Sequence, residues 1–150
     1  MNRPLLSMAG EYAVASEVCR RDLYSQITLG NLKRTDILVY NPVTGKQAKI
    51  EVKSKQARWW PSVRGINGPR ELLVFVDFQG VKDEARPVFY VMNKWDWQRY
   101  LKRFVLKASW FHHLDQGFIP VDKHGNFGVG VESKEISRYR EKWKKLKKIV

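Results

Sequence analysis

The sequence predicts a single α/β domain, residues 1–150, in which a mixed, mostly antiparallel central sheet is flanked by helices. Three observations lead to this fold class. Apolar residues recur at helical spacing near the N-terminus, short apolar runs of strand length follow, and two segments toward the C-terminus have a helical pattern again. A chain of 150 residues is long enough to bury a hydrophobic core of its own.

The first helix is expected between Leu6 and Leu23, and the segment TLGN that begins at Thr28 breaks its pattern. Its apolar stripe would consist of residues at helical spacing, namely Met8, Tyr12, Ala15, Cys19 and Leu23. Cys19 is the only cysteine, so the chain has no intramolecular disulfide and no cysteine-built zinc site.

A β-hairpin is predicted next. The apolar run DILVY (36–40) is followed by the turn-forming segment NPVTG (41–45) and then by KQAKIEVK (46–53). After a loop at 56–70, the apolar run ELLVFVDF (71–78) and the run RPVFYVM (86–92) are expected as two further, buried strands.

The C-terminal third is expected to be a helical extension, about 93–150, of a core that spans about 1–95. A long helix over 94–111 would begin after Asn93, which can cap it. A loop with at most a short strand would follow, and a basic helix capped by Ser133 would end the chain.

The turn of the hairpin fixes which residues face each other. If the four residues after Asn41 form the loop, Asn41 pairs with Lys46, and counting outward places Asp36 directly opposite Glu51. Lys53 returns to the same face two residues later. Opposed carboxylates repel each other, and their oxygens suit a hard divalent cation such as Mg²⁺. Charges of this kind also occur on surface hairpins that have no function, but the apolar character of both strands favours a site.

The charge of the chain indicates a polyanionic partner. Lys and Arg number 28 against 15 Asp and Glu, which gives a net charge of +13, and nucleic acid is the first candidate for such a partner. No apolar run has the ~20 residues that a membrane span needs, and the N-terminus lacks the apolar core of a secretion signal. We therefore expect a cytoplasmic protein that does not act in a membrane.

Asp36 followed by the tripeptide EVK at 51–53 resembles the signature of the PD-(D/E)XK nuclease superfamily, with Thr35 in place of the proline. The segment GEYAVASEV at 10–18 is similar to the first-helix glutamate segment of archaeal Holliday junction resolvases and related small nucleases. The expected order of helix and three strands follows that of a restriction-endonuclease-like core. The resemblance covers roughly the first 95 residues.

This resemblance implies a metal-dependent DNA endonuclease that acts as a homodimer. Glu11, Asp36 and Glu51, helped by the Val52 carbonyl, would hold Mg²⁺, with Mn²⁺ as a substitute, and Lys53 would assist the attacking water.

Glu11 is preferred to Glu17 as the carboxylate of the first helix. With residues about 100° apart, Glu11 lies about 80° from the centre of the expected stripe and Glu17 about 160° from it. Glu17 is therefore expected to face solvent.

Basic residues that flank the expected site are candidates for phosphate contacts, namely Lys33, Arg34, Lys55 and Arg58. Trp59 and Trp60 would wedge into or stack on bases, or else pack in the core or form a dimer contact. Two other functions remain open, a nuclease-like module that binds nucleic acid without cutting it and an RNA-processing nuclease.

Overall fold

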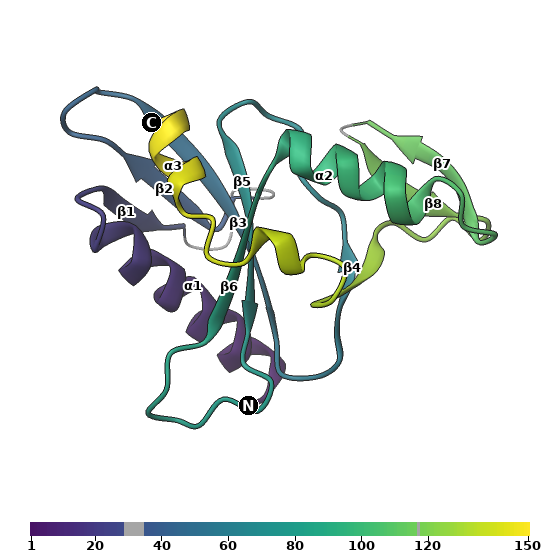
Figure 1. Cartoon of the computed structure of the whole chain (residues 1–150), viewed down its shortest axis with the longest axis horizontal. Helices are drawn as coiled ribbons and strands as arrows, with labels where there is room; N and C mark the ends of the chain where they lie inside the picture. The colour runs from purple at the N-terminus through teal and green to yellow at the C-terminus, as the bar shows by residue number, and fades with distance from the viewer. Residues whose placement is uncertain (29–34, 117) are drawn as a thin grey trace.

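A five-stranded sheet forms the centre of the protein in a computed structural model that describes residues 1–28, 35–116 and 118–150 (Figure 1). The strand order is β1-β2-β3-β5-β6, and every neighbouring pair is antiparallel except β3 and β5. The strands are β1 Tyr24–Ile27, β2 Ile37–Tyr40, β3 Gln47–Lys55, β5 Glu71–Asp77 and β6 Val88–Asn93. The predicted α/β class with a mixed, mostly antiparallel sheet is confirmed.

The register of the β2–β3 hairpin is the predicted one as far as Ile37, but Asp36 does not lie directly opposite Glu51 as expected, because its amide bonds to the Ile50 carbonyl. Ile37 lies opposite Ile50, and the Asn41 amide donates to the Lys46 carbonyl over 2.9 Å. Gly45 closes the turn with a φ of 71°, a conformation that glycine adopts without steric cost. Local turn chemistry and the two-residue period of a strand are sufficient to set this register.

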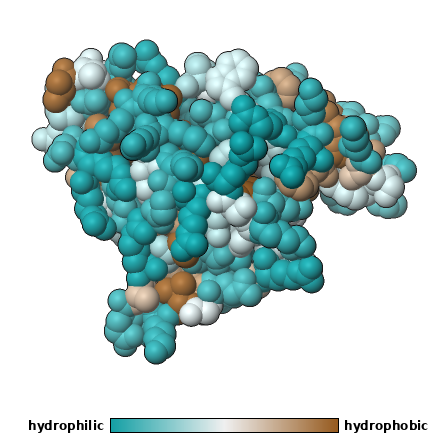
Figure 2. Space-filling view, in the orientation of Figure 1, coloured by the Kyte–Doolittle hydropathy of each residue, from teal (hydrophilic) through white to brown (hydrophobic). Residues whose placement is uncertain are grey.

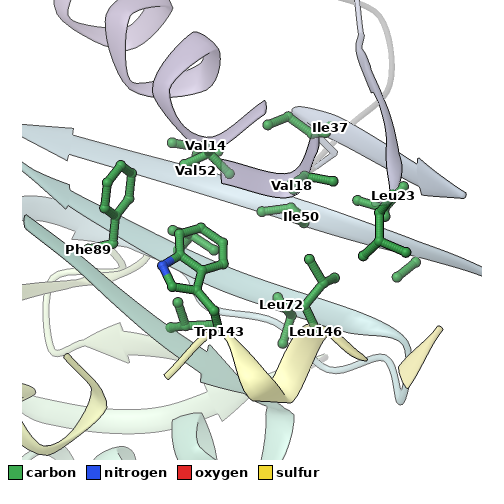
Figure 3. Packing of buried hydrophobic residues seen from close by; sticks show 14 of the residues in the cluster. Val14, Val18, Leu23, Ile37, Ile50, Val52, Leu72, Phe89, Trp143 and Leu146 are labelled. Carbon is green, nitrogen blue, oxygen red and sulfur yellow. The ribbon is translucent and has the colours of Figure 1, made fainter. Parts of the chain in front are cut away.

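One face of the sheet is covered by α1 (Arg3–Cys19) and by the C-terminal segment that ends in α3 (Lys144–Ile149). Figure 3 shows Val14 and Val18 of α1 meeting the β-strand side chains of this face, with Trp143 and Leu146 packed beside them. The apolar surface that these elements bury together is the first of two hydrophobic clusters.

The other face carries the second hydrophobic cluster. It packs against α2 (Lys94–Tyr100) and against a small sheet of β4 (Trp59–Val63) and β9 (Val129–Glu132). The loop expected at 56–70 therefore contains a strand. Its partner β9 lies about seventy residues away along the chain, so no local pattern could have indicated the pairing.

The buried side of α1 differs from the expected stripe. Met8 and Tyr12 are 49% and 62% exposed. The buried residues of the helix are Gly10, Val14, Glu17 and Val18. A Cβ atom at Gly10 would lie 1.8 Å from the Ser54 hydroxyl oxygen, so the glycine is what allows α1 to approach β3 on this side.

The long helix expected over 94–111 is wrong beyond its first part. Asn93 caps α2 as predicted, through a capping box with Asp96, and the helix continues as a π-helix over Leu101–Val105. The chain then enters β7 (Phe111–Asp115), which pairs with β8 (Ile119–Asp122). The π-helical turn ends the helix early.

The basic terminal helix is also wrong in extent. Only a 3₁₀ turn, η2 (Ser137–Tyr139), and the short α3 are helical in this region. The Ser133 hydroxyl donates to Asp77 over 2.8 Å instead of capping a helix. Residues that the helix would have used pack on both faces of the sheet instead, Trp143 and Leu146 in the first hydrophobic cluster and Ile136 and Tyr139 in the second.

The surface seen in Figure 2 is mostly hydrophilic, with small apolar patches that lie apart from one another. None of the helices formed by the described residues combines the length and the apolarity that a membrane span requires.

Candidate active site

The candidate site begins where β2 leaves β3. β2 pairs with β3 only as far as Ile50, although β3 continues to Lys55. The Asp36 amide donates to the Ile50 carbonyl over 3.0 Å while Ile37 is also paired with Ile50, so two residues face one, as in a β-bulge. The Asp36 carboxylate turns into the sheet edge and accepts a 2.6 Å hydrogen bond from the Val52 amide.

Glu51 and Lys53 lie on β3 just beyond this bulge. Glu51 is only 5% exposed, and its carboxylate forms an ion pair with the Lys53 ammonium, with 2.8 Å between the two atoms. The two residues are two apart on a strand, so their side chains project from the same face. Charge compensation by Lys53 offsets the cost of burying Glu51.

Glu11 reaches the same place from α1. Its carboxylate accepts a 3.2 Å hydrogen bond from the Ser7 hydroxyl. Burial raises the pKa of Glu11, and the nearby charge of Asp36 raises it further, whereas Ser7 and the ammonium of Lys53 lower it. The structure thus brings Glu11, Asp36, Glu51 and Lys53 into one acidic corner, which is the name used below for these four residues.

A cavity of about 160 Å³ adjoins the acidic corner. It lies between the start of α1, which contributes Arg3 and Ser7, the part of β3 around Lys53, and β4. Within the described part of the chain, the hydroxyl of Ser54 is buried without a hydrogen-bond partner and belongs to the lining of this cavity. Two cations and a spare hydroxyl suit an anionic group such as a phosphate.

The donor set fits a hard divalent metal. No group of three or more His, Cys, Asp or Glu side chains within residues 1–28, 35–116 and 118–150 has the geometry of a metal cluster. Mg²⁺, however, is usually bound through one or two carboxylates together with water and substrate phosphates. Asp36 and Glu11 are carboxylates whose mutual repulsion a cation would relieve, and Val52, whose amide binds Asp36, also has a carbonyl that would be a hard oxygen ligand.

The four basic residues expected to contact phosphates do not share one environment. Lys55 is only 2% exposed, and its ammonium is bonded to Asp77 over 2.8 Å and to the carbonyl of Ala57 over 3.0 Å. Lys55 is therefore not available for the expected phosphate contact, because its parallel partner on β5, Asp77, binds its ammonium. Arg58 is exposed and paired with Glu132 over 3.3 Å. Lys33 and Arg34 lie outside the described residues.

The two adjacent tryptophans have opposite environments. Trp60 is 1% exposed, belongs to the second hydrophobic cluster and donates its indole N–H to the Val76 carbonyl over 3.3 Å. Trp59 is 51% exposed. Core packing is therefore the role of Trp60, and only Trp59 is accessible to a partner.

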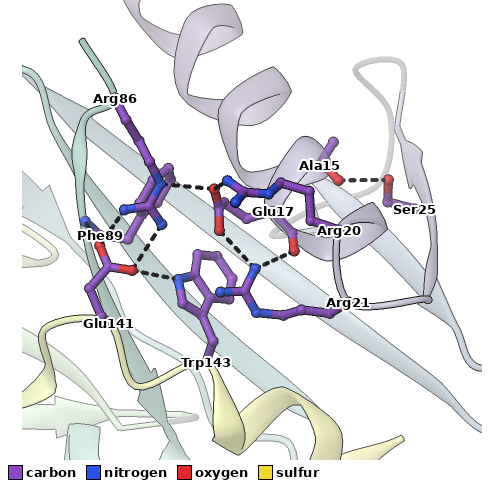
Figure 4. A network of polar contacts seen from close by, with 9 residues as sticks. All are labelled: Ala15, Glu17, Arg20, Arg21, Ser25, Arg86, Phe89, Glu141 and Trp143. Atoms are coloured by element: carbon purple, nitrogen blue, oxygen red, sulfur yellow. Dashed lines mark hydrogen bonds and ion pairs between the residues drawn. The ribbon is translucent and has the colours of Figure 1, made fainter.

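Glu17 is not on the solvent side, contrary to the expectation. It is only 4% exposed and accepts ion pairs from Arg21 over 2.7 Å and from Arg20 over 3.0 Å (Figure 4). The Arg86 guanidinium pairs with it over 2.9 Å. These arginines, Arg86 first, lower the pKa of Glu17 to about 2.

The Glu17 network extends to the C-terminal segment. Arg86 also binds both oxygens of Glu141 at 2.9 Å, and the Trp143 indole donates to Glu141 over 3.0 Å. The sequence offered a signal only for the local part, since Arg20 and Arg21 follow Glu17 at helical spacing. The network ties α1 to the C-terminal segment and leaves Glu11 as the glutamate of α1 that is available for chemistry.

Comparisons with protein-family models, with curated proteins and with solved structures found no match for this chain. The function is therefore inferred from the residues of this chain and from their geometry.

Proposed function

We propose that the protein is a metal-dependent DNA endonuclease of the PD-(D/E)XK type, which hydrolyses phosphodiester bonds. The observation that carries the proposal is the acidic corner. Asp36 is bonded to the Val52 amide, the Glu51–Lys53 ion pair stands beside it on β3, and Glu11 of α1 is close enough for its pKa to respond to both Asp36 and Lys53.

Each residue of the acidic corner has a chemical role in this proposal. Glu11, Asp36 and Glu51, with the Val52 carbonyl, would hold Mg²⁺ or, in its place, Mn²⁺. The bound metal would polarise the phosphoryl group and lower the pKa of water. Lys53 would orient the attacking water and neutralise charge that develops on the phosphoryl oxygens.

The charge of the chain supports nucleic acid as the substrate. A net charge of +13 attracts a polyanion, and the cavity next to the acidic corner provides Arg3 for a phosphate contact. The three carboxylates of the acidic corner would repel a polyanion and weaken its binding unless they hold a metal. Their presence therefore favours a catalytic protein over one that only binds nucleic acid. Because one site cuts one strand, we propose that a homodimer cuts duplex DNA.

The variant Asp36→Asn tests the proposal. Asn has nearly the same size, and its amide oxygen can accept the bond from Val52, so the protein should fold. Nicking of plasmid with Mg²⁺ should fall at least about a hundredfold, equivalent to about 2.7 kcal/mol of transition-state stabilisation. Binding to DNA in EDTA should stay the same or tighten, because a negative group is lost.

The matched control is Asp83→Asn, which removes an exposed carboxylate from the loop before β6 and should nick as the wild type does. Wild-type nicking by a folded Asp36→Asn protein would refute the assignment. A wild-type protein that binds junction, duplex and single-stranded DNA but cuts none of them with either metal would be a binding module. Cleavage of RNA alone would make it an RNA-processing nuclease.

A further inference from the structure

Further cavities lie where α2 and the π-helix meet the segment around η2. Figure 1 shows the backbone of these elements to the right of the central sheet. Two adjoining cavities of about 120 and 350 Å³ share Arg103, Phe104, Glu135 and Arg138. Arg99 lines one of them and Lys134 the other. The basic pocket, as it is called below, consists of Arg99, Arg103, Lys134 and Arg138. It shares no residue with the cavity beside the acidic corner.

Two arginines of the basic pocket form no ion pair with a carboxylate in the described part of the chain. Arg103 and Arg138 are exposed, and in the described part of the chain neither has a carboxylate within ion-pair distance. Each guanidinium lies near an aromatic ring, Arg103 at 5.1 Å from the Phe104 centroid and Arg138 at 5.8 Å from that of Tyr139. A ring face positions a guanidinium and leaves its N–H groups available to an anion.

The other two cations are held only weakly. Arg99 reaches Asp96 at 3.5 Å with its side chain 58% exposed, and Lys134 pairs with Glu132 at 3.0 Å with its side chain 73% exposed. Ion pairs this exposed contribute little, so either cation can turn toward a phosphate.

The carboxylate in the basic pocket is bound internally. Glu135 accepts the hydroxyl of Tyr100 over 3.1 Å and the amide of Glu132 over 2.9 Å through the same oxygen. Burial, with help from Glu135, raises the pKa of Tyr100, so its hydroxyl keeps the proton that it donates. Among the residues that line the two cavities, four cations therefore face one carboxylate, Glu135, which is already hydrogen-bonded.

The backbone here is irregular as well. Leu106 donates to the Leu101 carbonyl over 3.0 Å, the five-residue spacing of a π-helix. Such turns are rare and occur frequently at functional sites. This one follows directly on α2, which carries Arg99, and itself contains Arg103, so it helps to set the direction in which the two arginines project.

We propose that the basic pocket binds phosphates of a nucleic-acid backbone, as a contact separate from the acidic corner. Guanidinium groups match phosphate oxygens in a bidentate geometry. The four cations extend over two adjoining cavities, more than a single small anion needs, and the net charge of +13 calls for a polyanion. The inference goes beyond cleavage, because it holds whether or not the protein cuts what it binds.

The experiment measures binding of a labelled DNA duplex in EDTA by fluorescence anisotropy across a range of salt concentrations. In the double variant Arg103→Gln/Arg138→Gln, affinity should fall about tenfold or more, and the slope of log K against log salt should become shallower by about 1 to 2, since each phosphate contact contributes about 0.9. The variant Arg103→Lys/Arg138→Lys keeps both charges and should keep the slope.

The matched control Lys46→Gln/Lys123→Gln removes the same charge from two exposed positions elsewhere and should change the slope by less. Glu135→Gln should tighten binding, because it removes the negative charge that lines both cavities and keeps the acceptor for Tyr100. Each variant is checked by circular dichroism, and Arg138→Gln alone serves if the double variant does not fold.

Two results would overturn the proposal. The first is an equal loss of slope in the control and in the double variant. The second is saturable binding of inorganic phosphate that the double variant loses while its DNA binding stays intact, which would mark a site for a small phosphate compound. Because binding is measured in EDTA, without metal, a negative result in this experiment does not contradict the nuclease proposal. Likewise, a protein that does not nick DNA would not contradict the proposal that the basic pocket binds phosphates.

Discussion

Two glutamates of α1, six residues apart, have opposite environments. Glu17 lies in a closed network in which Arg20, Arg21 and Arg86 compensate its charge, and its pKa falls to about 2. The acidic corner around Glu11 has an excess of carboxylates, and the pKa of Glu11 is raised.

The difference separates a structural charge from a reactive one. A buried carboxylate with three cationic partners is stable as it is and has no capacity left for a ligand. A carboxylate near another carboxylate costs stability at neutral pH until a cation arrives, and perturbations of that kind are typical of functional sites. Under the proposed function, the same helix therefore provides one glutamate that stabilises the fold and one that binds the metal.

The largest expected effect is that of Glu17→Gln. The change removes the carboxylate that Arg21 pairs with and leaves Arg86 with Glu141 alone. It should cost about 3 kcal/mol in the free energy of unfolding, the lower end of the range for breaking a buried ion pair. Urea unfolding at pH 7 measures it. A loss below about 0.5 kcal/mol would mean that the network does not stabilise the fold.

The pH dependence of stability should change in the same variant. The folded pKa of Glu17, about 2, is below its ordinary value of 4.5, so its stabilisation is complete above pH 4.5 and is lost as the pH falls toward 2. The Glu17→Gln protein should lose less stability over that interval than the wild type.

The second effect concerns the metal. Mg²⁺ that binds only the folded acidic corner should stabilise the wild type by about 2.7 kcal/mol at a concentration 100 times Kd. Thermal unfolding with and without Mg²⁺ measures this, and Asp36→Asn should lose most of the shift. In carboxyl-detected NMR the signal of Glu11 should move with Mg²⁺ while that of Glu17 stays. Equal movement of both signals would show non-specific binding.

The smallest effect is that of Glu11→Gln. Because the folded pKa of Glu11 is raised, the ionised group opposes folding at neutral pH, and this penalty disappears as the pH falls below the raised value. Removing the charge should leave stability within about 0.5 kcal/mol of the wild type at pH 7, on the stabilising side. A clear destabilisation would make Glu11 structural, as Glu17 is.

Several features followed from the sequence because local interactions decide them. The turn after Asn41 and the two-residue strand period set the hairpin register, which brought Asp36 near Glu51 and Lys53. The apolar runs of β5 and β6 were long enough to identify, and Asn93 with Asp96 marked the start of α2. The acidic corner is thus largely a consequence of one hairpin.

Other features depend on contacts between residues far apart in the chain. Which side of α1 is buried depends on the approach of Gly10 to Ser54, and the larger apolar residues of the helix gave the wrong stripe. Arg86 could not be assigned to Glu17 from sequence, because 69 residues separate them.

The sequence by itself determined the α/β class, most of the hairpin register and the closeness of Asp36 to Glu51 and Lys53, since hydrogen bonding and periodicity within about twenty residues set them. That Glu11 joins them depends on the packing of α1 against β3. The tertiary structure alone decided that β4 pairs with β9, that Lys55 is buried against Asp77, and that the basic pocket forms beside the π-helix. These depend on burial and pairing between distant segments, where packing overrides local propensity.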